Sequence, residues 1–158
     1  MVVAFISAFI IPMVLQVDDY GKFKLYTFYA SYIGVTHLGY CDGIYLKYGG
    51  YSETQIDSKN IRREWSTLLI YESFLAVAIL IYGIYAQDLI IICLALTVVP
   101  NVVFTFYTQI FQATGDFSKY TRMMNLSTLF NLLLNLLLVI IGIDSYEIYM
   151  LGSVTIQI

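Results

Sequence analysis

Charged residues are scarce in this sequence of 158 residues. Asp, Glu, Lys and Arg make up 12% of the chain, whereas an average soluble domain contains about a quarter. Hydrophobic residues make up 59%, which is more than one small soluble core can bury. A soluble protein of this composition would expose large apolar patches that drive aggregation. The composition therefore predicts that the solvent of this chain is a lipid bilayer.

Basic clusters, cysteine clusters and catalytic motifs are also lacking. The formal net charge is −3, and no run of Lys and Arg is long enough for a nucleic-acid surface. Cys41 and Cys93 lie in apolar stretches without CxxC spacing or a nearby His cluster, so we expect neither a metal site nor a disulfide framework. No GxxxxGK[ST], GxSxG or HExxH motif occurs. We therefore expect no enzyme and no cofactor.

The apolar residues are grouped into windows of the length that crosses a membrane, which is about 20 residues for a helix. We expect an all-α, polytopic transmembrane helix bundle with about five complete spans and the start of a sixth. These expected spans are residues 2–17, 26–45, 66–85, 89–111, 124–143 and the incomplete 148–158. Pro100 should kink the fourth span because it removes one backbone hydrogen bond.

The charges of the connections predict an orientation. Six of the eight basic residues lie in the second and fourth connections: Lys47, Lys59, Arg62, Arg63, Lys119 and Arg122. Acidic residues dominate the other connections: Asp18, Asp19, Asp88, Asp144 and Glu147. Since cytoplasmic loops hold Lys and Arg preferentially, the N-terminus should be cytoplasmic in a multi-pass protein of the cytoplasmic membrane. We expect Asp18 and Asp19 to form a solvated outer turn rather than a metal site.

The most unusual stretch is 34–43, in the second expected span. His37 and Asp42 are ionisable residues in an apolar segment, where each costs about 3 kcal/mol on insertion scales. Such residues normally face a bundle interior or a water-filled cavity, so both are candidates for proton handling or substrate contact. Alternatively, Gly39 and Gly43 form a packing seam of small residues and Asp42 lies hydrated near the cytoplasmic end.

Polar residues of other spans are further candidates for the substrate or ion pathway. Asn101 and Gln109 lie in the fourth span, where amides bond sugar hydroxyls or, more commonly, bridge helices. Glu72 in the third span is likewise either a pathway residue or a residue that bonds another helix. Arg62 and Arg63 precede the third span, where they could attract a pyrophosphate. We favour contacts between these two arginines and anionic lipid headgroups on the cytoplasmic side.

Three stretches resemble the polysaccharide biosynthesis flippases of the multidrug/oligosaccharidyl-lipid/polysaccharide exporter superfamily. DDYGKFKLY at 18–26 is similar to that family's turn after helix one, where a YG pair precedes helix two. LGYCDGIYLKYGG at 38–50 is similar to the family's LG..DG.YL.YGG end of helix two. QATGDFSKY at 112–120 resembles the QATG.F..Y turn after helix four. The three motifs occur in the family's order, and the resemblance spans nearly the whole chain.

The resemblance implies a transporter of roughly twelve or more helices in two pseudo-symmetric bundles. Its substrate would be an undecaprenyl-pyrophosphate-linked oligosaccharide, carried across the cytoplasmic membrane for polysaccharide biosynthesis in the cell envelope. The other partners would be membrane lipids. The first expected span begins without a flank and the sixth does not finish, so we expect a truncated N-terminal fragment. Such a fragment would need the missing C-terminal bundle to close a transport cavity.

Three other functions stay open. A related drug or cation exporter would have an acidic cation site deep in the bundle, for which Asp42 and Glu72 are the acids in spans two to five. An integral-membrane glycan enzyme would need clustered Asp, Arg or His on a substantial loop. The longest loop expected here is only the stretch 46–65. An interaction subunit that does not itself transport is the third.

Overall fold

The computed structural model describes residues 11–52, 55–142 and 145–156. It is 86% helical, and the residues that it describes contain no β-strand. In chain order the elements are α2 (Val17–Ser31), the 3₁₀ turn η1 (Ile33–Val35), α3 (Tyr40–Tyr48), α4 (Ser58–Ala86), α5 (Leu89–Ala113), α6 (Phe117–Ile141) and α7 (Tyr146–Ile156). The all-α class expected from the sequence is therefore confirmed.

Three helices, α4, α5 and α6, are long and apolar enough to cross a membrane. They correspond to the expected spans at 66–85, 89–111 and 124–143, and Pro100 lies within the single helix α5. The first expected span lies mostly outside the described residues, of which 11–14 are helical. The incomplete sixth span begins within α7. The described residues thus contain three helices that could cross a membrane, and the predicted total of five complete spans is not confirmed.

Both α4 and α6 begin earlier in the chain than expected, because an aspartate caps the start of each. Asp57 Oδ1 accepts a hydrogen bond from the Lys59 amide at 3.0 Å, and Asp116 Oδ1 accepts one from the Lys119 amide at 3.1 Å. A carboxylate at this position satisfies an amide that has no partner inside the helix, and the helix dipole favours its negative charge. The second and fourth connections are therefore partly helical.

The second expected span, 26–45, is not one continuous helix. α2 ends at Ser31 and α3 begins only at Tyr40, with η1 and an irregular segment between them. Leu38 and Gly39 have φ angles of 49° and 76°, in the left-handed region that an α-helix does not use. Apolar character predicts that a segment is buried in lipid or protein, but it does not predict that the backbone within it stays regular.

Asp18 and Asp19 lie in the first turn of α2 and not in a turn outside a helix, although Asp18 is exposed as expected. Negative charge is favourable at a helix N-terminus because the backbone amides there carry partial positive charge. Asp19 Oδ1 also lies 3.3 Å from Lys22 Nζ, one turn along the same helix. The acidic pair therefore starts a helix instead of preceding one.

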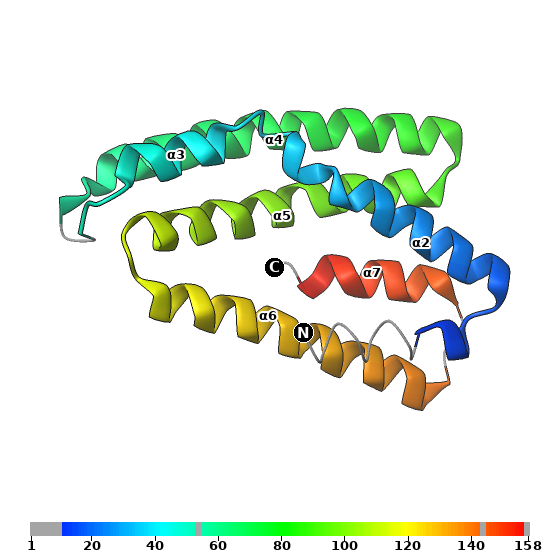
Figure 1. Cartoon of the computed structure of the whole chain (residues 1–158). Helices are drawn as coiled ribbons and strands as arrows, with labels where there is room; N and C mark the ends of the chain where they lie inside the picture. The colour runs from blue at the N-terminus through cyan, green and yellow to red at the C-terminus, as the bar shows by residue number, and fades with distance from the viewer. Residues whose placement is uncertain (1–10, 53–54, 143–144, 157–158) are drawn as a thin grey trace.

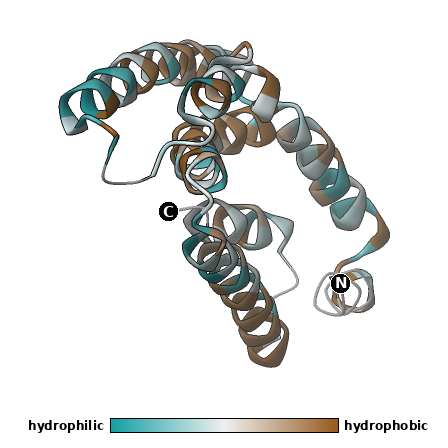
Figure 2. Ribbon diagram, turned by 60° about the vertical axis from the view of Figure 1, so that its left-hand side comes forward, coloured by the Kyte–Doolittle hydropathy of each residue, from teal (hydrophilic) through white to brown (hydrophobic). Residues whose placement is uncertain are grey.

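α5 is the centre of the molecule and packs against α2, α3, α4, α6 and α7. Its most extensive contact is with α4, which lies antiparallel beside it (Figure 1). Gly83 on α4 permits this approach, because a Cβ atom there would lie 3.0 Å from the Ile92 backbone nitrogen. Figure 2 shows apolar residues along the length of the long helices, as expected for a chain whose solvent is lipid.

The connections fall at two opposite ends of the bundle (Figure 1). The α3–α4 connection and the α5–α6 turn lie at one end, where the Gly50 amide donates to the Ala113 carbonyl at 3.2 Å. The start of α2, the α4–α5 turn and the α6–α7 connection lie at the other end. We name them the basic end and the acidic end, after the charges that the sequence places in these connections.

Candidate functional site

The break between α2 and α3 interrupts an otherwise helical segment. Both flanking helices are regular, and α2, the break and α3 together run from the acidic end to the basic end (Figure 1). Leu38 adopts its positive φ without the conformational freedom of glycine, which stores strain in the backbone. Irregular backbone at membrane depth occurs where it lies within protein or lines a cavity, so the break is a candidate functional region.

Glu72 is fully buried (0% exposed) at the midpoint of α4. It shares a helix face with Leu68, one turn earlier, and that face packs against the break and α5. The Thr36 hydroxyl lies 3.0 Å from Glu72 Oε2 and 3.2 Å from Oε1. A carboxyl group at the middle of an apolar helix is costly and usually functional.

His37, the only histidine of the chain, follows Thr36 in the break. Its side chain is 8% exposed, and its Nδ1 atom is buried without a hydrogen-bond partner among the described residues. The imidazole lies within electrostatic range of the Glu72 carboxyl group. It also lines a cavity of about 360 Å³ between the break and α4, together with Leu38, Gly39, Tyr40, Thr67, Leu68 and Tyr71. We call Thr36, His37 and Glu72 the Glu72 site.

Asp42 and Gln109 meet beside the Glu72 site. Gln109 Nε2 on α5 lies 3.4 Å from Asp42 Oδ1 on α3, so this amide bridges two helices. Cys41 is fully buried and lies within electrostatic range of both Asp42 and Glu72. His37 thus lies in the break and Asp42 on α3, and only Asp42 has a side-chain hydrogen bond, which it makes with Gln109.

A second polar cluster lies at the basic end, where the end of α3 meets the start of α4. Lys47 pairs with Glu64, and the Tyr48 hydroxyl donates to Glu64 Oε2 at 3.0 Å. Burial raises the pKa of Tyr48, and its hydrogen bond to Glu64 raises it further. The hydrogen bond to Glu64 also raises the pKa of Lys47. These contacts connect the end of α3 to the start of α4.

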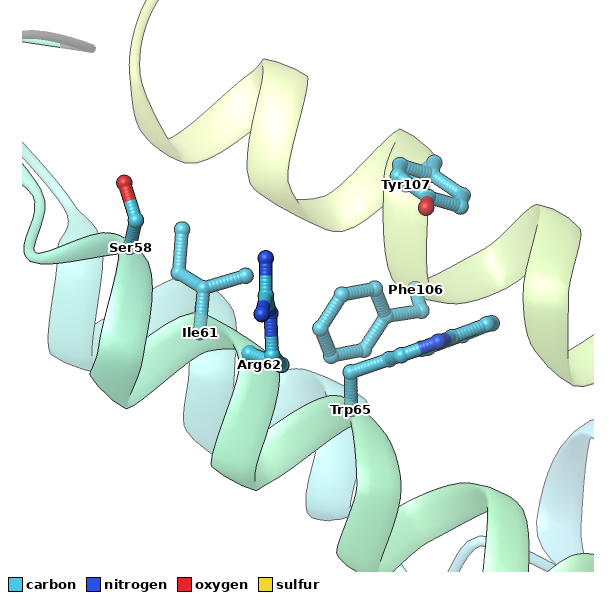
Figure 3. Close-up of a pocket in the computed structure, with 6 residues that line it drawn as sticks. All are labelled: Ser58, Ile61, Arg62, Trp65, Phe106 and Tyr107. Atoms are coloured by element: carbon cyan, nitrogen blue, oxygen red, sulfur yellow. The ribbon is translucent and has the colours of Figure 1, made fainter.

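Arg62 and Arg63 differ in their surroundings, although both are exposed. Arg62 lines a cavity of about 270 Å³ between α4 and α5, together with Ser58, Ile61, Trp65, Phe106 and Tyr107 (Figure 3). The rings of Trp65 and Phe106, whose centroids lie 4.8 Å apart, form one wall of this cavity. A guanidinium beside aromatic rings at a helix end can bind an anionic group while the rings contact apolar chains. Arg63 does not line this cavity.

The structure does not unite all candidates into one site. Asn101 lies half-buried in α5, and no hydrogen bond between described residues joins it to the Glu72 site. No group of three or more His, Cys, Asp and Glu side chains gathers to hold a metal ion in the described ranges. Of the seven candidates, His37 and Glu72 therefore lie together at the break, and Asp42 and Gln109 meet between α3 and α5.

Sequence reasoning missed the hydroxyl groups. Thr36 bonds Glu72, and Tyr26 bonds Thr97 at 2.9 Å, between α2 and α5. Ser153 on α7 lies 3.1 Å from the same Tyr26 hydroxyl, so three helices share one buried network. Hydroxyl residues are common in apolar spans, and nothing in their spacing distinguishes those that bond across helices.

No family model, curated protein or solved structure matches this chain.

Proposed function

We propose that this chain is part of a membrane transporter that moves undecaprenyl-pyrophosphate-linked oligosaccharides across the cytoplasmic membrane. The observation that carries the proposal is the interrupted segment α2–α3, packed against a buried carboxyl group at the midpoint of α4. Discontinuous helices beside polar groups at mid-membrane depth are typical of secondary transporters, which bind substrates and ions there. The choice of substrate rests on the resemblance of the motifs at 18–26, 38–50 and 112–120.

In the proposed placement in the membrane, α4, α5 and α6 are spans. The segment α2–α3 is a further, interrupted span, which comes second in the expected chain order. The two connections rich in Lys and Arg lie together at the basic end, and the acidic connections lie at the opposite end (Figure 1). This separation supports a cytoplasmic basic end and a cytoplasmic N-terminus, since cytoplasmic loops retain basic residues. The segments 2–17 and 148–158 complete the expected count of spans in this proposal.

The proposed route of the substrate begins at the basic end. The Arg62 guanidinium would bind the pyrophosphate through charge-assisted hydrogen bonds, while Trp65 and Tyr107 contact the lipid chain. Asp42 and Gln109 bridge α3 and α5, where their polar groups can bond sugar hydroxyls. A second bundle, contributed by a further segment or a further chain, would enclose the headgroup opposite the break. Nothing in this route requires covalent chemistry, so the proposed protein is no enzyme.

One observation favours the rival function of drug or cation export. That function needs an acidic residue deep in the bundle, and Glu72 is fully buried at the midpoint of α4. A glycan enzyme is less well supported, because no group of three or more His, Cys, Asp and Glu side chains gathers among the described residues. The two transport functions differ in substrate and share the requirement for a gated polar path.

Rescue of surface polysaccharide tests the proposed substrate. The reading frame that contains this sequence is expressed in a bacterial strain without its own flippase, and surface polysaccharide is measured with wild type, Arg62→Gln and Arg63→Gln. We expect wild type to restore polysaccharide and Arg62→Gln to reduce the export rate by about tenfold, because charge-assisted hydrogen bonds to the pyrophosphate are lost. Arg63→Gln is the matched control and should retain export within about twofold, since Arg63 is exposed outside the cavity.

Membrane insertion of each variant is measured in the same cells. A well-inserted wild type that restores no polysaccharide would sink the oligosaccharide assignment. If the same protein instead lowers the accumulation of cationic dyes, the rival export function replaces it. Equal loss in Arg62→Gln and Arg63→Gln would show that general headgroup attraction, and not the cavity, determines the effect.

A further inference from the structure

The surroundings of Glu72 contain almost no positive charge to balance a carboxylate. On α5 the residues from Leu89 to Ala113 include no Asp, Glu, Lys, Arg or His. The titratable groups around the site are His37 and Tyr40 in and after the break, Cys41 and Asp42 on α3, Tyr71 on α4, and Cys93 and Tyr107 on α5. α3 also carries Tyr45, Lys47 and Tyr48 towards the basic end, where Lys47 pairs with Glu64 and not with Glu72. Of the groups around the site, only His37 can carry a positive charge. Glu72 must therefore be neutral or paired with a protonated His37, because an isolated charge in the membrane interior is too costly.

The Thr36 hydroxyl has one proton and two acceptors within reach. Its Oγ1 atom lies 2.7 Å from the Ile33 carbonyl oxygen and 3.0 Å from Glu72 Oε2. A protonated Glu72 donates to Thr36 Oγ1, which leaves the Thr36 proton for the Ile33 carbonyl. An ionised Glu72 can only accept, so the Thr36 proton turns to the carboxylate and leaves Ile33. The charge of Glu72 thus decides a hydrogen bond inside the break.

We propose that Thr36, His37 and Glu72 form a proton-binding site that controls the break between α2 and α3. The proton leaves a Glu72 carboxyl oxygen and reaches the His37 Nδ1 atom through intervening water, because Nδ1 makes no direct hydrogen bond to Glu72. The neutral pair becomes a carboxylate and an imidazolium, and no other covalent bond breaks. The imidazolium then loses this proton to water in the cavity that His37 lines. In the neutral-pair state Thr36 holds the Ile33 carbonyl of η1; in the ionised state it holds Glu72.

Two further observations point to the same role. The break is strained at Leu38, and a strained backbone with a second hydrogen-bond arrangement nearby can change conformation at low cost. The Nδ1 atom is buried and unpartnered among the described residues, so no existing hydrogen bond competes for an arriving proton. The role of this proton as the coupling ion of a transporter depends on the proposed function. The existence of the proton-binding site does not.

The single histidine makes the site accessible to spectroscopy without resonance assignment. The full chain is labelled with ¹⁵N-histidine, placed in lipid nanodiscs, and titrated by NMR as wild type, Glu72→Gln and Glu64→Gln. Gln keeps the shape of Glu72 and removes its charge, so we expect the midpoint of the His37 titration to differ from that of wild type. Glu64→Gln, which removes a carboxylate from the same helix beside Lys47, is the matched control and should leave the midpoint unchanged.

Infrared difference spectroscopy of the same samples provides a second readout. We expect a protonated-carboxyl band that titrates with pH, is absent in Glu72→Gln, persists in Glu64→Gln, and shifts in Thr36→Val but not in Thr36→Ser. Equal His37 midpoints in wild type and Glu72→Gln, or no carboxyl band assigned to Glu72, would overturn the proton site. A midpoint that depends on sodium at constant ionic strength would overturn it too, because Glu72 would then hold a metal cation. Neither measurement needs a substrate, so failed polysaccharide rescue with an intact titration removes only the flippase.

Discussion

The Glu64 carboxylate contacts two side chains at the basic end, and its contribution to stability should depend on pH. It accepts the Tyr48 hydroxyl at 3.0 Å and pairs with Lys47, and these contacts raise the pKa values of both partners above their ordinary values of 10.0 and 10.5. A raised pKa means that the folded state favours the protonated form. The resulting stability is complete below pH 10 and is lost as the pH rises through the raised values.

Glu64→Gln should therefore lower thermal stability at neutral pH and lose this effect in alkali. The free energy of unfolding of wild type and variant is compared in detergent micelles across this range, and the difference should shrink above the ordinary pKa of Tyr48, 10.0. Glu147→Gln on α7 is the control, since Glu147 is an exposed carboxylate far from this cluster. A difference between wild type and Glu64→Gln that stays constant into alkali would show that the pair contributes no folded-state preference.

Single residues show where prediction from the sequence reaches and where it stops. His37 and Glu72 could be singled out because an ionisable group in an apolar span is rare and costly. Thr36 could not, because its role depends on a hydroxyl that lies opposite Glu72 only when the chain breaks after Ser31. Arg62 and Arg63 are equivalent as sequence neighbours, and only the packing of α4 on α5 separates them.

At the scale of elements, the long helices were predictable and the interruption was not. Hydropathy alone locates α4, α5 and α6, because about 20 apolar residues in a row have few alternatives to a membrane-spanning helix. The break between α2 and α3 leaves no comparable signal, since its residues are as apolar as the helices around it. The helix starts at Ser58 and Phe117 were missed because capping aspartates stabilise polar first turns that hydropathy assigns to loops.

The α4–α5 hairpin depends on Gly83, which lies one turn before the connection. A Cβ atom at this position would lie 3.0 Å from both the backbone nitrogen and Cγ1 of Ile92. The backbone atom cannot move aside as a flexible side chain could, so Gly83→Ala must separate the two helices. We expect a loss of about 1–3 kcal/mol in the free energy of unfolding, measured by denaturant titration in micelles.

Gly21→Ala on α2 is the matched control for this substitution. No atom lies within 4 Å of a Cβ built on Gly21, so the added methyl group meets open space. Because alanine favours a helix over glycine by about 0.5–1 kcal/mol, this variant should be equally or more stable than wild type. Equal destabilisation by both substitutions would contradict the close approach at Gly83 and point to a general intolerance of the bundle.

At the scale of the whole molecule, the separation of charge between the two ends is the feature that no single helix contains. α4, α5 and α6 each reverse direction, so alternate connections must lie together, and the sequence places its basic residues in those of one end (Figure 1). The Gly50–Ala113 hydrogen bond joins the two basic connections directly. In a membrane this arrangement predicts one cytoplasmic face and one outer face.

Cysteine labelling on intact cells tests the predicted faces. In a background with Cys41→Ala and Cys93→Ala, single cysteines replace the exposed residues Val17 and Tyr85 at the acidic end, or Tyr51 and Ser118 at the basic end. We expect a membrane-impermeant maleimide to label the first two from outside and the other two only after permeabilisation. Labelling of Tyr51→Cys and Tyr85→Cys from the same side would mean that α4 does not cross the bilayer, which removes the basis for a buried site at Glu72. The reverse pattern would keep α4 as a span and place Arg62 on the outer face, where it could not meet a lipid-linked substrate made in the cytoplasm.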